Sequence, residues 1–188
     1  MPQGRSGFTE WFQACGASDW LYVPVSAFHS TTPEKQIVGW REWVGLPQIP
    51  VPWMKAKIDT GARSSALHAF DIEPFERGGV PWVRFSVHPW QRSALDTAVV
   101  ERPVHDVRHV RSSSGHAQER YVIQLDVRVL DQVVTAEVTL THRDAMGFRM
   151  LIGREALRGR FVVDSARSYR GGRPDQDTRD RNRGKHGA

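Results

Sequence analysis

Apolar and polar residues alternate with a period of two through much of the middle of the chain. Apolar positions alternate with lysines over residues 54–58, and the alternation returns over residues 83–87. Two longer alternating runs, residues 123–129 and 134–140, flank a short polar turn and so predict a β-hairpin. The pattern therefore predicts a mainly β protein whose strands are mostly antiparallel.

A short helix is expected near the end of this region. Residues 150–152 and 161–163 are wholly apolar, which is typical of buried strands. Between them, residues 154–158 can form one or two helical turns closed by Gly159. We expect a small closed β-barrel with one short C-terminal helix.

The chain divides into three segments. Residues 36–165 hold the periodic pattern and are expected to form one domain. Residues 1–35 contain several aromatic residues but sustain no period, so we treat them as an N-terminal extension of uncertain order. Residues 166–188 are almost devoid of apolar residues and are expected to be a disordered basic tail.

Composition narrows the class of protein. The 188 residues include 39% hydrophobic and 25% charged residues, which excludes a wholly disordered chain. No apolar run is long enough for a transmembrane helix, and the first residues lack the pattern of a signal peptide. Cys15 is the single cysteine, so neither an internal disulfide nor a cysteine-based zinc module is possible. We therefore expect a cytoplasmic protein that does not act on a membrane.

The basic charge is concentrated at the end of the chain. The formal net charge is +5, and seven basic against three acidic residues after position 166 contribute +4 of it. A nucleic-acid partner that uses this tail remains an alternative, but a charge held by the tail is weak evidence for a binding groove. Nucleic-acid binding is therefore not expected.

The segment Asp59-Thr60-Gly61-Ala62 is the most informative motif in the sequence. It follows the alternating run 54–58, so it lies where a strand ends and a turn begins. A carboxylate at such a place is exposed at the edge of a sheet, and Gly61 permits close approach of a substrate because it has no Cβ. Asp and Gly also form ordinary turns, so the motif alone leaves both interpretations open.

A second motif follows 94 residues after Asp59. Residues 151–154 read Leu-Ile-Gly-Arg and are followed by the expected helix. The order of strand, Asp-Thr-Gly-Ala, hairpins, apolar-apolar-Gly and helix resembles the retropepsin-like aspartic protease domain. The resemblance implies a retropepsin-like closed β-barrel, the acid-protease fold.

Three stretches are similar to a particular bacterial family, which carries the name ATP-dependent zinc protease and is associated with RimK-type glutamate ligases. The stretches are residues 57–68, 111–115 and 150–157. The resemblance covers about residues 36–164. It implies a hydrolase of the aspartic-type endopeptidase class that acts on a peptide or protein substrate.

The resemblance also implies a mechanism and an assembly. Aspartic proteases place two carboxylates so close that they share one proton, and one activates water while the other protonates the substrate. This chain has one Asp-Thr-Gly, so we expect a homodimer with Asp59 of each subunit at its axis. Asp59, Thr60 and Gly61 are the expected catalytic residues, and Thr60 is expected to brace the two loops against each other.

Substrate binding is expected from the loop after the catalytic aspartate, from a flap and from the second motif. Ser114 and Gly115 lie in a Ser- and Gly-rich turn between strand-like runs, which suits the tip of a flap, although an ordinary hairpin loop fits equally well. The expected substrate-binding residues are Ala62, Arg63, Ser114, Gly115, Gly153 and Arg154.

Arg63 departs from the family pattern, in which an acidic residue at this position pairs with the arginine after the second glycine. Here Arg63 faces Arg154 if the fold is correct, and two arginines repel unless an anion lies between them. Glu155 is one candidate for that anion. Our hypothesis is that an acidic, glutamate-rich peptide substrate supplies it, held by bidentate arginine contacts.

No cofactor is expected from the residues themselves. The chain has no glycine-rich phosphate loop and no His-Glu-x-x-His motif. His105 and His109, with His116 beyond them, are the nearest candidates for zinc ligands, and zinc otherwise rests on the family name. Two alternatives stay open: a zinc-dependent peptidase, and a non-catalytic β-barrel module that binds acidic peptides.

Overall fold

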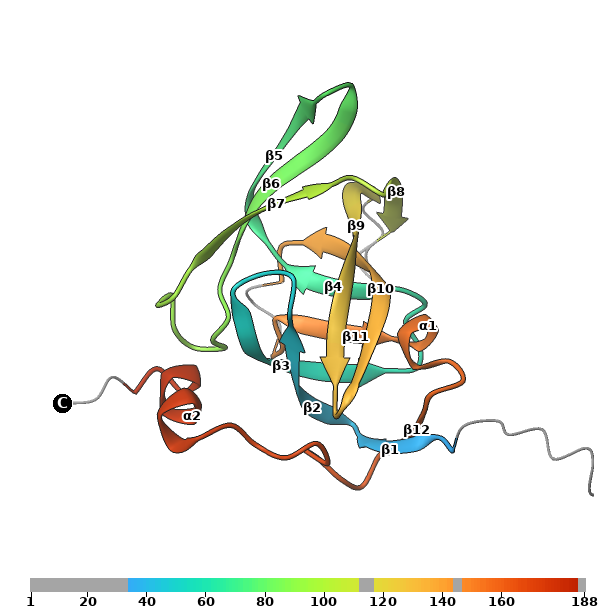
Figure 1. Ribbon diagram of the computed structural model, residues 1–188, viewed down its shortest axis with the longest axis vertical. Coiled ribbons are helices and arrows are strands. Elements are labelled where there is room, and N and C mark those ends of the chain that lie inside the picture. The colour runs from blue at the N-terminus through green and yellow to red at the C-terminus, as the bar shows by residue number, and fades with distance from the viewer. Residues whose placement is uncertain (1–33, 112–116, 144–146, 186–188) are drawn as a thin grey trace, which may run out of the picture. The chain divides into compact units, whose positions relative to one another are not determined.

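Six strands close into a barrel, which confirms the predicted fold class (Figure 1). The computed structural model describes residues 34–111, 117–143 and 147–185. Each barrel strand is hydrogen-bonded to the next in the order β10-β4-β11-β3-β2-β9, and β9 pairs with β10 to complete the ring. The barrel strands are β2 (Arg41–Leu46), β3 (Val51–Asp59), β4 (Ser65–His68), β9 (Ala117–Val129), β10 (Gln132–Thr141) and β11 (Met150–Gly153).

The alternation read from the sequence decides which side chains fill the barrel. In β3, Met54, Ala56 and Ile58 are buried, whereas Lys55 and Lys57 lie on the outer surface. The hairpin of β9 and β10 repeats this alternation, and its register pairs Val138 with Ile123. All four residues of β11 are buried, as expected for an apolar run with a paired strand on each side.

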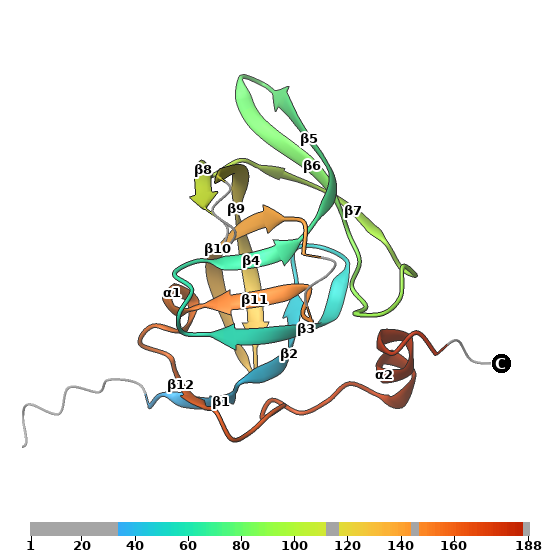
Figure 2. The ribbon, with the colours of Figure 1, turned by 180° about the vertical axis from the view of Figure 1, so that it is seen from behind.

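Four further strands extend the barrel. A three-stranded antiparallel sheet of β5 (Phe70–Arg77), β6 (Val80–Val87) and β7 (Ala98–Pro103) projects from one end of it (Figure 2). Gly78 and Gly79 turn the β5–β6 hairpin with φ of 60° and 76°, a conformation that glycine adopts without strain. β8 (Asp106–Arg111) pairs antiparallel with β9, so the two form a hairpin around residues 112–116.

The region after the second motif forms the expected helix and strand. The helix α1 (Arg154–Leu157) follows β11 directly, and β12 (Phe161–Asp164) pairs in parallel with β1 (Gln36–Gly39). In this two-stranded sheet Ile37 and Val162 are 47% and 51% exposed.

The segment after β12 corrects the prediction of a disordered tail. Residues 165–175 run along β2 as a strap, and a second helix, α2 (Gln176–Asn182), follows. The N–H of Trp40 donates to Arg167 O at 3.0 Å, and the N–H of Tyr169 donates to Arg41 O at 2.9 Å. The strap is therefore held mainly by backbone hydrogen bonds, together with isolated contacts such as the Tyr169 ring 6.4 Å from that of Trp43. Such isolated contacts leave no apolar pattern, which is why the composition suggested disorder.

A buried carboxylate fastens this strap to the barrel. Glu42 is fully buried, and its side chain accepts hydrogen bonds from the N–H groups of Gly39 at 2.6 Å, Arg170 at 2.9 Å and Gly171 at 3.3 Å. Bonds to a charged acceptor are stronger than those between neutral groups. Glu42 thus satisfies backbone groups of the strap and of β1 at one point.

The predicted N-terminal extension lies almost wholly outside the described residues, which begin at Glu34. Within the part of the chain that is described, no helix is long and apolar enough to cross a membrane.

Replacing Glu42 by Ala is expected to lower the free energy of unfolding by about 3 kcal/mol, because buried donors lose a charged acceptor. Urea unfolding followed by tryptophan fluorescence measures this change. Glu42→Gln, which keeps one side-chain oxygen, is expected to lose less. An unchanged midpoint for Glu42→Ala would show that the strap does not depend on this carboxylate.

Candidate active site

Asp59 is the last residue of β3 and lies beside the last residue of β11. The two strands run parallel, and their register pairs Asp59 with Gly153. The two motifs, 94 residues apart in the sequence, therefore meet at one edge of the barrel. The Asp59 side chain is 26% exposed, so the carboxylate is open to solvent and is not sealed inside the barrel.

Backbone groups of the turn fix one oxygen of this carboxylate. The Oδ1 atom of Asp59 accepts hydrogen bonds from the N–H of Gly61 at 3.1 Å and of Ala62 at 3.2 Å. The Oδ2 atom lies 3.5 Å from Lys57 Nζ, two residues earlier on the same face of β3. Because both side chains of this pair are partly exposed, the ion pair contributes no more than about 1 kcal/mol. One carboxylate oxygen is thus held by the backbone, and the other contacts an exposed lysine.

Gly153 permits the turn after Asp59 to approach β11. A Cβ atom at Gly153 would lie 2.5 Å from the carbonyl carbon and oxygen of Ser64, which is closer than real Cβ atoms come to backbone. The Gly153 N–H donates to Ser65 Oγ at 3.2 Å. The predicted site residue Gly153 therefore positions the loop, and this requirement for space explains the glycine.

The start of α1 binds the backbone of the same loop. The N–H of Arg154 donates to Ala62 O at 2.8 Å, and the N–H of Glu155 donates to Arg63 O at 3.2 Å. The guanidinium of Arg154 also donates to Gly61 O at 3.0 Å. Arg154 thus lies at the Asp-Thr-Gly turn, where it contacts main-chain oxygen, and its role in substrate binding stays a prediction.

Arg63 is exposed and lines a hollow of about 200 Å³ with Glu155 and Glu137. Glu155 was one candidate for an anion between Arg63 and Arg154. Its carboxylate instead lies 2.7 Å from Arg158 on the next turn of the chain. Thr60 is exposed at the same edge.

The predicted flap tip falls in the hairpin of β8 and β9. Strand pairing continues to Arg111 and Ala117, on either side of the tip. Ser114 and Gly115 lie outside the described residues, so their role stays a prediction. At the base of the hairpin, Arg108 Nη2 is 2.7 Å from Glu137 Oε2, which ties β8 to β10.

Arg143, just after β10, was not predicted. Its N–H donates to His68 Nδ1 at 2.9 Å, and no described residue accepts a hydrogen bond from its buried Nε atom. Burial, with repulsion from Arg120, lowers the pKa of Arg143, and attraction to Asp59 acts against that shift. A cation therefore lies within electrostatic range of Asp59. The sequence holds no signal for it, since it is a single loop arginine 84 residues away.

The histidines proposed as zinc ligands interact with different carboxylates. His105 Nε2 is 3.5 Å from Glu137 Oε1, and His109 Nε2 is 3.8 Å from Glu119 Oε2. His116 lies outside the described residues. Within those residues, no group of three His, Cys, Asp or Glu side chains could hold a metal ion.

Comparisons with known proteins place these motifs in a family. The model of the retropepsin-like aspartic endopeptidase RimB matches residues 37–174, and so includes the first part of the strap. Two curated relatives carry the name probable alpha-L-glutamate ligase. The protein from Desulfotalea psychrophila is 42% identical over 132 residues, which are 70% of this chain and 28% of that protein. The protein from Shewanella pealeana is 44% identical over 135 residues, which are 72% of this chain and 30% of that protein.

The chain thus spans less than a third of the length of these relatives. Among solved structures, a protein of unknown function from Legionella pneumophila has a TM-score of 0.63 and 28% sequence identity. The similarity covers 73% of this chain and 99% of that one. The family match over most of the chain, with Asp59 and Gly153 side by side, shows that this protein belongs to the RimB-like family of retropepsin-like aspartic endopeptidases.

Proposed function

We propose that the protein is an aspartic peptidase that hydrolyses peptide bonds as a homodimer and prefers acidic peptides. One observation carries this proposal: the carboxylate of Asp59 is held by two backbone N–H groups at the barrel edge and is partly exposed. A structural turn aspartate needs no exposed second oxygen, whereas a catalytic one does.

Two copies of Asp59 supply the acid and the base of the reaction. The ionised carboxylate takes a proton from water while the water oxygen bonds to the carbonyl carbon, and the protonated carboxyl gives its proton to the carbonyl oxygen. When the tetrahedral intermediate collapses, a proton passes to the amide nitrogen and the C–N bond breaks. The chain carries one such aspartate in an Asp-Thr-Gly turn, so a second copy of the chain supplies the other.

Exposed groups near this turn support the dimer. Thr60 is exposed at the same edge as Asp59. Ile37 and Val162 are large apolar side chains that are about half exposed on the two-stranded sheet of β1 and β12. Pairing of such a sheet with its copy would bury these side chains and satisfy its free edges.

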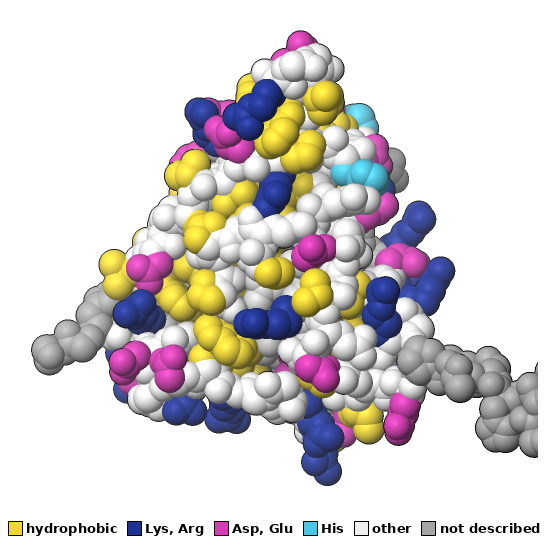
Figure 3. All heavy atoms as spheres, viewed as in Figure 1, with side chains coloured by type: hydrophobic (Ala, Val, Ile, Leu, Met, Phe, Trp, Pro, Cys, Tyr) yellow, Lys and Arg dark blue, Asp and Glu magenta, His cyan; other side chains and the backbone are white. Residues whose placement is uncertain are grey.

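The preference for acidic peptides rests on the charges beside Asp59. Lys57 and Arg154 contact the catalytic turn, Arg63 is exposed beside it, and Arg143 lies within electrostatic range. On the outer face shown in Figure 3, by contrast, basic side chains are interspersed with acidic and apolar ones. The relatives named as glutamate ligases suggest glutamate-rich chains as substrates.

A second candidate is a non-catalytic module that binds acidic peptides. The contact between Lys57 and Asp59 favours it, because a carboxylate neutralised by a lysine has less reason to share a proton with another carboxylate. In the peptidase, the partner's aspartate or the substrate displaces this exposed lysine. Location in the cytoplasm and the absence of a cofactor stay predictions for both candidates.

Asp59→Asn is expected to abolish cleavage of a fluorescence-quenched peptide that has four glutamates on each side of the central bond, since the amide cannot act as a base. The variant should keep the circular dichroism spectrum and the peptide affinity of the wild type. Asp131→Asn, at the β9–β10 turn, is the matched control and should retain full activity. Cleavage by Asp59→Asn would contradict catalysis by this aspartate, whereas peptide binding without cleavage by the wild type would favour the non-catalytic module.

Arg63→Ala is expected to reduce kcat/KM for the glutamate peptide about tenfold, because one charge-assisted contact to the substrate is lost. The rate for a peptide with glutamine at every glutamate position should change little. Arg160→Ala removes an exposed arginine just after α1 and is the control. Equal rates for the two peptides with the wild type would contradict the acidic preference.

A further inference from the structure

A cationic groove lies between the barrel and the end of α2. It has a volume of about 690 Å³. The lining residues come from the start of β2, from β3, from the β6–β7 and β10–β11 connections, and from the end of α2 and the residues just after it. Among them are the cations Arg41, Lys55, Arg92, Arg183 and Lys185 and the aromatic residues Trp40 and Phe148.

No acidic residue lines the described part of this groove. The carboxylate of Asp180, on α2 nearby, already lies 3.1 Å from Arg183 Nη1 and accepts a hydrogen bond from Gln176 at 2.8 Å. Burial, followed by repulsion from Arg41 and Arg183, lowers the pKa of Lys55. Among the described residues, Arg183 is the one cation of the groove that lies against a carboxylate. The remaining cations repel one another, and an anion in the groove relieves that repulsion.

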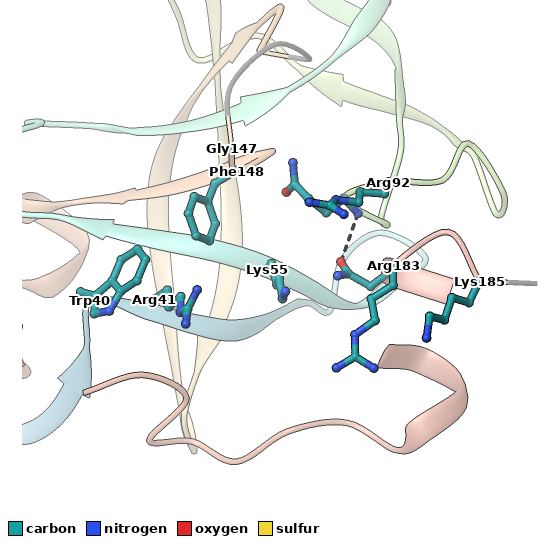
Figure 4. A pocket seen from close by; sticks show the side chains of 10 residues that line it. Trp40, Arg41, Lys55, Arg92, Gly147, Phe148, Arg183 and Lys185 are labelled. Carbon is teal, nitrogen blue, oxygen red and sulfur yellow. Dashed lines mark hydrogen bonds between the residues drawn. The ribbon is translucent and has the colours of Figure 1, made fainter. Parts of the chain in front are cut away.

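The end of α2 and the residues just after it form one side of this groove. The side chain of Asn182 is buried and accepts a hydrogen bond from Gln91 N at 3.1 Å, while its backbone oxygen accepts one from Arg92 N at 3.2 Å. These two bonds hold α2 against the segment after β6. They bring Arg183 and Lys185 opposite Arg92 and Lys55 (Figure 4).

The groove leads toward the catalytic aspartate. Figure 4 shows Trp40 and Arg41 at one end, Lys55 in the middle and Lys185 at the other end. Trp40 O accepts a hydrogen bond from Ile58 N at 2.9 Å, so that end lies next to Asp59 in the sheet. Lys55, Lys57 and Asp59 occupy every second position of β3 and so lie on the same outer face. Four residues of strand span about 13 Å, which is the distance along β3 from Lys55 to Asp59.

We propose that this groove is an exosite that holds acidic side chains of the peptide substrate about four or more residues from the bond that is cleaved. The inference rests on the proposed function and adds a second point of contact to it. An extended peptide advances about 3.3 Å per residue, so four residues reach from Asp59 to Lys55.

A peptide fits the groove better than a nucleic acid does. Nucleic-acid sites for single strands combine cations with open aromatic faces on which bases stack. Here the guanidinium of Arg41 covers the Trp40 ring at 4.5 Å from its centre, and Phe148 packs edge-on against that ring at 5.9 Å. The aromatic wall is thus already covered, whereas the cationic side chains of the tail remain exposed.

Fluorescence anisotropy with a labelled hexaglutamate peptide and the full-length Asp59→Asn protein tests binding separately from cleavage. Arg92→Gln and Arg183→Gln are each expected to weaken hexaglutamate binding about tenfold. Arg77→Gln, an exposed arginine on β5, is the matched control and should not change the affinity. Equal affinity in all variants would overturn the exosite even if the wild type cleaves acidic peptides, and tighter binding of a hexauridylate probe would overturn it in favour of a nucleic acid.

Cleavage kinetics supply the second readout. For a peptide with glutamates five and six residues before the cleaved bond, Arg92→Gln should raise KM about tenfold and leave kcat unchanged. For a shorter peptide that ends three residues before that bond, the same variant should behave like the wild type. A fall in kcat with both peptides would mean that Arg92 supports the fold of the active site, which would contradict the exosite.

Discussion

The parallel pairing of β3 with β11 is the contact on which the candidate site depends. It joins two strands whose last residues, Asp59 and Gly153, stand opposite each other. Because Gly153 has no side chain, the loop after Asp59 can pack against β11 and turn its N–H groups toward the carboxylate. Gly153 also directly precedes α1, whose first residues donate hydrogen bonds to that loop. The hydrogen bonds that fix the loop at this edge of the barrel thus also orient the carboxylate of Asp59.

Positive charge is the second feature that organises the molecule. The sequence places most of the net charge in the tail, which suggested a solvated extension without a role in the fold. In the structure the tail returns to the barrel, and buried Glu42 and Asn182 hold it there. Cations from the tail and from β3 then line one groove, so the positive charge in the groove is larger than either segment supplies alone. In the proposed peptidase, substrate selection therefore depends on Arg183 and Lys185 as well as on the Asp-Thr-Gly turn.

The barrel could be predicted because β3, β9 and β10 alternate and the motifs of the chain occur in a fixed order. Asp59 and Gly153 were selected through the resemblance to the retropepsin-like domain, and the structure adds that they stand opposite each other. The strap could not be predicted, since its binding depends mainly on backbone groups and on the buried carboxylate of Glu42, and neither leaves an apolar pattern in the sequence. Arg143 and Lys55 were missed for a related reason: a single cation acquires its role from distant residues, which only the folded chain brings near it.

The central claim is that each chain supplies one half of a pair of catalytic carboxylates. The dependence of activity on protein concentration tests this most directly, with the quenched acidic peptide as substrate and oligomeric state followed in the same samples by sedimentation. The account predicts that the rate per chain falls toward zero as dilution separates the dimer. A rate per chain that stays constant while the protein sediments as a monomer would contradict it.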